Sequence, residues 1–139
     1  MILLDTNVLI YAFDAGAPMH TWARATLRDA SLGEGAAINT VILSELLVGE
    51  QSPEAALQRL EAFGVHLLDL PIAAAVRGAQ AYKLYLENRR QQAELPAAPK
   101  SPLPDFLIGA HASALKLSIA TADTGRYQNY FTEVPLLTP

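Results

Sequence analysis

Four acidic residues stand at positions where a carboxylate needs a local explanation. Asp5 lies between two apolar runs, 2–4 and 8–10. Glu45 lies within 41–48, a segment with helical pattern that is apolar on nearly every side, where a glutamate is rarely buried without a partner. These two positions suggest that a polar site interrupts an otherwise apolar interior.

Two further acids stand at the boundaries of expected elements. Asp105 follows a proline-rich stretch and opens an apolar helical pattern, and Asp123 follows an apolar run. Each of the four acids also has a purely structural interpretation. Asp5 and Asp105 could cap helices, Asp123 could belong to a turn, and Glu45 could face solvent. Both interpretations stay open at the level of single residues.

Taken as one set, the four carboxylates predict a metal-dependent chemistry. They stand 40, 60 and 18 residues apart, so only the fold could join them, and once joined they would repel one another. A divalent cation removes that conflict, and Mg²⁺ or Mn²⁺ prefers oxygen ligands. Such an ion can polarise a phosphodiester and activate water. The chain has no cysteine and three scattered histidines, which offer no competing zinc site.

Alternating short apolar runs and helical patterns predict the elements that must position these acids. We expect strands over 2–5, 36–39, 65–68 and 117–121, with 134–137 as a candidate fifth. We expect helices over 6–13, 19–32, 41–48, 53–63, 71–90 and 105–116. Strands that alternate with helices predict an α/β fold whose mainly parallel sheet is covered on both faces. Because ligands bind at the carboxyl ends of such strands, Asp5 and Asp123 would share one edge.

Three local predictions concern single elements. Thr40 is expected to cap the helix over 41–48. The prolines within 95–104 predict an ordered loop or arm. In the helix over 71–90, the apolar face is expected to comprise Ile72, Ala75, Val76, Ala79, Tyr82 and Leu86.

Bulk composition limits the class of protein. With 139 residues and a net charge of −4, the chain is expected to form one domain over 1–139 and is not a basic nucleic-acid binder as a whole. Residues 1–70 carry −6 and residues 71–139 carry +2, which indicates a bipolar surface unless the unevenness is chance. Neither a basic leader nor an apolar run of about 18 residues is visible, so we expect a cytoplasmic protein without membrane segments.

Four sequence motifs point to a family. They are "LLDTNVLIY", "NTVILSELLVGE", "PDFLIGAHA" and "IATADTGRYQNYF". They occur in this order and are spread over nearly the whole chain. Together they resemble a PIN domain, specifically the VapC-like toxins of bacterial type II toxin–antitoxin systems. The resemblance implies that the four family acids, with catalytic and metal-binding roles, are Asp5, Glu45, Asp105 and Asp123. It assigns supporting polar roles to Thr6, Asn7 and Thr121.

The resemblance also implies a fold, an activity and partners. The fold would be a three-layer α/β/α domain with a central sheet of four to five strands. The activity would be Mg²⁺- or Mn²⁺-dependent endoribonuclease cleavage, and the partners a small antitoxin and a second copy of the chain. Many relatives carry a further acid a few residues past the fourth, whereas 124–126 reads Thr-Gly-Arg here. This difference favours one metal ion rather than two.

Substrate and partner contacts are predicted on weaker grounds. An acidic site needs nearby cations to hold an RNA backbone, and ordinary surface charge is the alternative for each candidate. The candidate RNA-backbone contacts are Arg89, Arg90, Lys100, Lys116 and Arg126. The candidate antitoxin or dimer contacts, which could equally belong to the core, are Trp22, Leu27, Leu57, Leu60 and Phe63.

Two other classes of function compete with the nuclease. A haloacid-dehalogenase-type phosphatase also places an aspartate after its first strand, but it needs a second aspartate where Asn7 stands. A catalytically silent PIN-like module that acts only through protein or RNA partners is the second alternative. The presence of all four acids favours the enzyme over this module.

Overall fold

A five-stranded parallel sheet forms the centre of the computed structural model, which describes residues 1–92, 98 and 102–139. Its strand order is β3-β2-β1-β4-β5, and every neighbouring pair is parallel. The strands are β1 (Ile2–Leu4), β2 (Ala36–Asn39), β3 (His66–Leu68), β4 (Ser118–Ala120) and β5 (Leu136–Leu137). The predicted parallel sheet is therefore confirmed, including its fifth strand.

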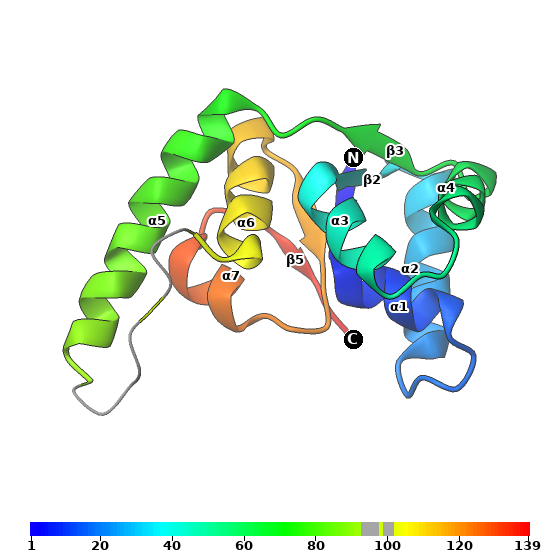
Figure 1. Cartoon of the computed structure of the whole chain (residues 1–139), viewed down its shortest axis with the longest axis horizontal. Helices are drawn as coiled ribbons and strands as arrows, with labels where there is room; N and C mark the ends of the chain where they lie inside the picture. The colour runs from blue at the N-terminus through cyan, green and yellow to red at the C-terminus, as the bar shows by residue number, and fades with distance from the viewer. Residues whose placement is uncertain (93–97, 99–101) are drawn as a thin grey trace.

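Helices cover the sheet on two sides (Figure 1). Helices α5, α6 and α7 lie together on one side, and α1 to α4 lie on the other. Their bounds are α1 (Thr6–Phe13), α2 (His20–Leu32), α3 (Thr40–Val48), α4 (Pro53–Ala62), α5 (Ile72–Arg90), α6 (Pro104–Leu115) and α7 (Gly125–Tyr130). This is the expected three-layer α/β/α arrangement.

The central strands are buried because their sequences are apolar on both faces. Leu3 and Leu4 of β1, Ile38 of β2 and Ile119 of β4 have no exposed surface. Leu3 pairs with Ala37 on one side and with Ile119 on the other. Strands β2 and β3 extend the sheet on one side of β1, and β4 and β5 extend it on the other. The strand order therefore reverses at β1, and open parallel sheets bind ligands at such a point.

The start of α3 differs from its prediction. Asn39, rather than Thr40, caps the helix: its backbone is extended, and its side-chain Oδ1 accepts a hydrogen bond from Ile42 N at 2.9 Å. Thr40 is already the first helical residue. The asparagine has the better position because the last residue of β2 is extended, as an N-cap must be.

The buried face of α5 also differs from its prediction. Ile72 and Val76 are 87% and 58% exposed. Of the predicted face, Tyr82 is buried and Leu86 packs against the core. The other buried residues of the helix are Ala74, Gly78 and Ala81. A β-carbon at Gly78 would already lie 3.4 Å from Leu107 and 3.5 Å from Ala110 of α6. The small residues therefore let α5 approach α6 closely, and this packing overrides the apolar pattern.

One helix was not predicted, and one predicted segment falls mostly outside the described residues. Helix α7 was not expected, because its short, polar sequence has no apolar periodicity and begins with a glycine. The predicted arm over 95–104 lies outside the described residues, apart from Ala98 and the positions from 102 onward. Within the described residues, none of the helices is long and apolar enough to cross a membrane.

Candidate functional site

Asp5 lies at the centre of a hydrogen-bond network where β1 meets α1. Its Oδ1 accepts from Thr6 N at 2.8 Å, so it is the N-cap of α1. Its Oδ2 accepts from Thr121 Oγ1 at 2.7 Å and from Asn7 Nδ2 at 3.2 Å. Only 5% of the residue is exposed, and this burial, opposed by these hydrogen bonds, raises the pKa of its carboxyl. Asp5 is therefore both the N-cap of α1 and a buried acid of the site.

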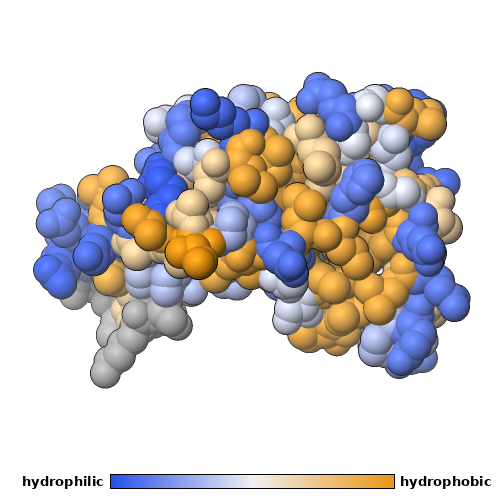
Figure 2. Space-filling model, turned by 90° about the horizontal axis from the view of Figure 1, so that it is seen from above, coloured by the Kyte–Doolittle hydropathy of each residue, from blue (hydrophilic) through white to orange (hydrophobic). Residues whose placement is uncertain are grey.

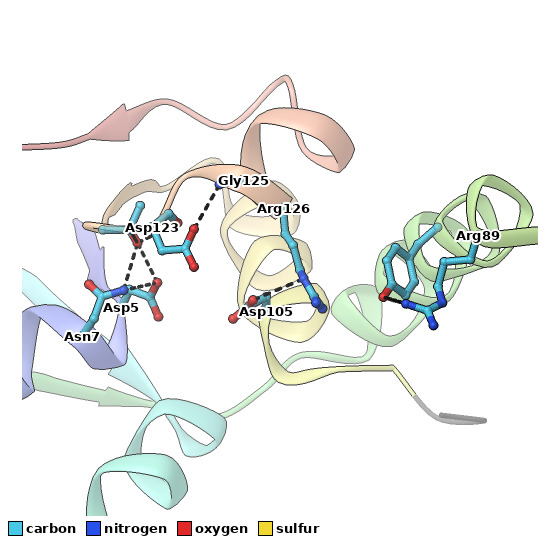
Figure 3. A network of polar contacts seen from close by, with 9 residues as sticks. Asp5, Asn7, Arg89, Asp105, Asp123, Gly125 and Arg126 are labelled. Atoms are coloured by element: carbon cyan, nitrogen blue, oxygen red, sulfur yellow. Dashed lines mark hydrogen bonds and ion pairs between the residues drawn. The ribbon is translucent and has the colours of Figure 1, made fainter. Parts of the chain in front are cut away.

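Asn7 and Thr121 bind the loop after β4 to the start of α1 (Figure 3). Asn7 Oδ1 accepts from Ala122 N at 3.0 Å, and Thr121 Oγ1 accepts from Asp123 N at the same distance. The contact between Asn7 and Ala122 joins residues 115 positions apart in sequence. These contacts fix the backbone of Asp123 next to Asp5 at the carboxyl edge of the sheet.

Glu45 reaches the same edge from α3. Its Oε1 accepts a hydrogen bond from Thr6 Oγ1 at 2.8 Å, and the residue is half-buried. The glutamate on the apolar helix therefore has a partner, and that partner is the residue next to Asp5. The alternative that Glu45 simply faces solvent does not describe its position.

Asp105 approaches from the first turn of α6. It is not the N-cap, since that position belongs to Leu103 and Pro104 is the first helical residue. Burial and the charge of Asp5 raise the pKa of Asp105 to about 6, and the charge of Arg126 opposes that rise. The negative charges of Glu45 and Asp123 also repel the ionised Asp105 carboxylate and raise its pKa further. Full ionisation of the metal-free site is therefore unfavourable, and a bound cation would relieve it.

The four predicted acids line one pocket of about 260 Å³. The structure therefore brings together carboxylates from the end of β1, from α3, from α6 and from the loop after β4. The complete lining is Asp5, Thr6, Asn7, Ile10, Glu45, Asp105 and Asp123. The polar residues predicted beside the acids also lie here, with Thr121 directly beneath Asp5.

The donor set suits a hard divalent cation, although the side chains are not closed around one. Among the described residues, no three acidic or histidine side chains converge closely enough to form a ready-made metal centre. The side chains available as metal ligands offer oxygens, however, and burial together with repulsion among the acids raises the pKa of Asp105. Mg²⁺ keeps several waters and needs few protein ligands, so such an open set of carboxylates fits it.

Tyr127 is a site neighbour that the sequence reading missed. Its side chain on α7 is 1% exposed, and its hydroxyl lies close enough to the Asp5 carboxylate for a hydrogen bond that lowers the pKa of that acid. Burial, followed by the charges of Asp5 and Asp105, raises the pKa of the phenol. Because α7 was not predicted, the helical spacing between Asp123 and Tyr127 could not reveal this neighbour.

The predicted RNA-backbone cations separate into different places. Arg126 Nε lies 3.7 Å from Asp105 Oδ2, and Arg89 donates to Tyr85 Oη at 3.1 Å farther along α5 (Figure 3). Arg90 is exposed at the end of α5. Lys116 follows the opposite end of α6 from Asp105, so the structure does not bring it to the pocket. Lys100 lies outside the described residues.

The predicted partner contacts divide between core and surface. Leu27 and Leu60 belong to the core, as the alternative interpretation held, and Trp22 packs against it half-buried. Phe63 lines a hollow of about 580 Å³ beside α2, and Leu57, 38% exposed, lines one of about 460 Å³ between α4 and β3. Figure 2 shows apolar side chains gathered over this side of the molecule.

Comparison with known families and proteins gives one family match. The model of the PIN domain matches residues 2–131. A search of curated protein sequences found no match.

Solved structures share the fold over essentially the whole chain. VapBC2 from Rickettsia felis, bound to a promoter DNA fragment, has a TM-score of 0.67 at 20% identity, covering 99% of this chain and 98% of that one. FitAcB from Neisseria gonorrhoeae has a TM-score of 0.66 at 25% identity, covering 100% of this chain and 98% of that one. VapC20 from Mycobacterium tuberculosis is described as a Sarcin-Ricin loop cleaving toxin. It has a TM-score of 0.65 at 16% identity, covering 97% of this chain and 99% of that one.

Proposed function

The chain belongs to the PIN domain family, and on that premise we propose that it is a metal-dependent endoribonuclease, the toxin of a toxin–antitoxin pair. One observation carries the proposal: four carboxylates from separate elements line one small pocket at the carboxyl edge of the sheet. We further propose that residues 1–139 form a single nuclease domain and that the cofactor is Mg²⁺ or Mn²⁺.

The carboxylates have distinct proposed roles. Asp5 and Asp105 would hold the ion directly, because burial and mutual repulsion leave these two most in need of a counter-charge. Glu45 and Asp123 would complete the site or orient the attacking water. The chemistry that the ion supplies when bound is polarisation of the phosphodiester and activation of that water.

The polar neighbours would keep the carboxylates in place during the reaction. Thr121 and Asn7 donate to Asp5, which fixes the orientation of its carboxylate. Thr6 does the same for Glu45. Such hydrogen bonds limit side-chain motion and so preserve the geometry that hydrolysis requires.

RNA is the proposed substrate, with Arg126 and Arg89 as phosphate contacts. Support comes from VapC20, a fold relative whose description names cleavage of a Sarcin-Ricin loop. The guanidinium groups of Arg126 and Arg89 lie 5.2 and 5.6 Å from the centre of the Tyr85 ring. Alternating guanidinium and aromatic groups can bind both the backbone and an unstacked base.

An antitoxin and a second copy of this chain are the proposed protein partners. Support comes from the solved relatives described as VapBC complexes and as a toxin–antitoxin complex from Klebsiella pneumoniae. In this chain, the hollows beside α2 and between α4 and β3 offer an apolar surface with basic side chains from Arg24 and Arg28 at its margin. We propose this face for the antitoxin.

RNA cleavage by the purified chain tests the proposed function. The protein should cleave single-stranded or structured RNA with Mg²⁺ and stop in EDTA. Asp5→Asn and Asp105→Asn should each abolish cleavage, whereas Asp29→Asn, at an exposed acid on α2, should not. Cleavage that persists in EDTA or in both site variants would refute the proposal and point to a contaminating nuclease.

A catalytically silent PIN-like binding module is the second candidate function. One observation favours it: the described residues contain no ready-made group of three metal ligands. Calorimetry with Mn²⁺ separates the two functions without RNA. Micromolar binding that is lost in Asp105→Asn supports the nuclease, and the absence of binding supports the module.

A further inference from the structure

Arg126 brings a positive charge to the carboxylate pocket. Its Nε lies 3.7 Å from Asp105 Oδ2, and the two side chains are 35% and 39% exposed. This distance is an ionic contact but is too long for a hydrogen bond. The pair is therefore held by charge alone and can exchange partners at little cost.

Two aromatic rings hold the guanidinium in this position. It lies 5.2 Å from the centre of the Tyr85 ring and 5.7 Å from that of Phe106. Cation–π contacts use no N–H···O hydrogen bond, so the N–H groups of Arg126 remain available to an oxygen acceptor. Arg126 would therefore keep its position near the pocket even if its contact with Asp105 were broken.

The charge of Arg126 and that of a divalent cation would serve the same carboxylates. Asp105 lines one pocket with Asp5, Glu45 and Asp123, and Arg126 is the basic side chain paired with it, at 3.7 Å. A cation held by these acids would compensate the same negative charge with twice the positive charge. Since like charges repel at this distance, the ion and the guanidinium would compete for Asp105.

We propose that Arg126 exchanges between two partners: Asp105 in the metal-free site, and a phosphate of the RNA substrate once a divalent cation is bound. The proposal rests on the nuclease function proposed above. An arginine released from its acid, still held by Tyr85 and Phe106, presents N–H donors beside the carboxylates. Phosphate oxygens are the acceptors that suit this planar group best.

Metal binding in the absence of RNA tests the first half of the proposal. Calorimetry of the metal-free chain with Mn²⁺ should show R126Q binding about 3- to 10-fold more tightly than the original protein, because a competing charge is gone. R126K should stay near the original affinity. Lys83→Gln, at an exposed residue of α5, removes the same charge elsewhere and should change little. The difference should shrink in high salt.

Kinetics with RNA test the second half. In saturating Mn²⁺, R126Q should show a KM about 10-fold higher with a nearly unchanged kcat, the signature of a lost ground-state phosphate contact. The two effects have opposite signs: the variant binds the ion better and the RNA worse. A merely structural defect would weaken both and would lower the melting temperature of the Mn²⁺-loaded protein.

The outcomes separate this inference from the proposed function. Equal or weaker Mn²⁺ binding by R126Q overturns the exchange, and so does an unchanged KM. If the original protein cleaves RNA with Mn²⁺ but either of these results is found, the nuclease function stands and the inference fails. If the original protein binds no Mn²⁺, both fall together.

Discussion

Thr6 Oγ1 donates a 2.8 Å hydrogen bond to Glu45 Oε1, joining residues that are 39 positions apart in sequence. Thr6 follows Asp5, the N-cap of α1, and its own backbone N–H bonds the Asp5 carboxylate. One threonine therefore contacts two of the four pocket acids, one through its backbone and one through its hydroxyl. The spacing between Asp5 and Glu45 depends on it.

Replacing this hydroxyl should disturb catalysis more than the fold. Thr6→Val keeps the shape of the side chain but leaves Glu45 without its donor, so we expect kcat to fall by about 10- to 100-fold. Thr6→Ser keeps the hydroxyl and should retain most of the activity. Steady-state cleavage of RNA in Mg²⁺ measures both. Equal activity of the valine and serine variants would show that the hydrogen bond has no catalytic role.

Asp105 should make the metal-free protein less stable as pH rises. Its folded-state pKa of about 6 lies above the usual aspartate value of 3.8, so the folded protein binds this proton more tightly than the unfolded chain. The resulting stability is present below pH 3.8 and is lost as pH rises through about 6. We expect Asp105→Asn to raise the free energy of unfolding at pH 7.5 by about 1 kcal/mol, discounted for a 39% exposed side chain.

Urea unfolding at two pH values checks this expectation. The stabilisation by Asp105→Asn should be clear at pH 7.5 in EDTA and should nearly vanish at pH 4. Adding Mn²⁺ should reverse the order, because the original protein gains a bound ion and the variant does not. Asp29→Asn is the control for an exposed acid. A destabilised Asp105→Asn at pH 7.5 without metal would contradict the repulsion inferred here.

The sequence was most informative at the ends of the strands, where an apolar run stops at a polar residue of the site. It located β2 at residues 36–39 and placed Asp5 at the end of β1, because an apolar run that stops at a polar residue is a local signal. The buried face of α5 and the position of Arg126 could not be predicted from such local signals. Both depend on how closely α5, α6 and α7 approach one another, which small residues such as Gly78 decide.

Gly109 should be among the least replaceable residues of α6. A β-carbon at this position would overlap the ring of Phe131, which is 1% exposed and has no free space to move into. We expect Gly109→Ala to lower the free energy of unfolding by about 3 kcal/mol. Gly49→Ala is the matched control, because its β-carbon would meet only Leu46 O at 3.8 Å. Urea unfolding at pH 7.5 that shows equal effects would exclude the predicted overlap.

A buried pair behind the pocket, Asn39 and His111, joins the elements that carry Glu45 and Asp105. Asn39 Oδ1 accepts from Ile42 N, so its amide nitrogen is the group 3.1 Å from His111 Nδ1. That nitrogen can only donate, so His111 Nδ1 must accept and the ring must be neutral. Burial lowers the pKa of His111 in agreement with this assignment.

This pairing predicts a loss of stability in acid. The folded-state pKa of His111 lies below the usual histidine value of 6.5. Its contribution to stability is therefore present above pH 6.5 and is lost as pH falls further. His111→Leu leaves the Asn39 amide without an acceptor and should cost about 1–3 kcal/mol at pH 7.5. The cost should shrink at pH 5, where the original protein must bury or expel a charged ring. Urea unfolding at both pH values measures it, and a cost that is constant or larger at pH 5 would mean that His111 is not held neutral.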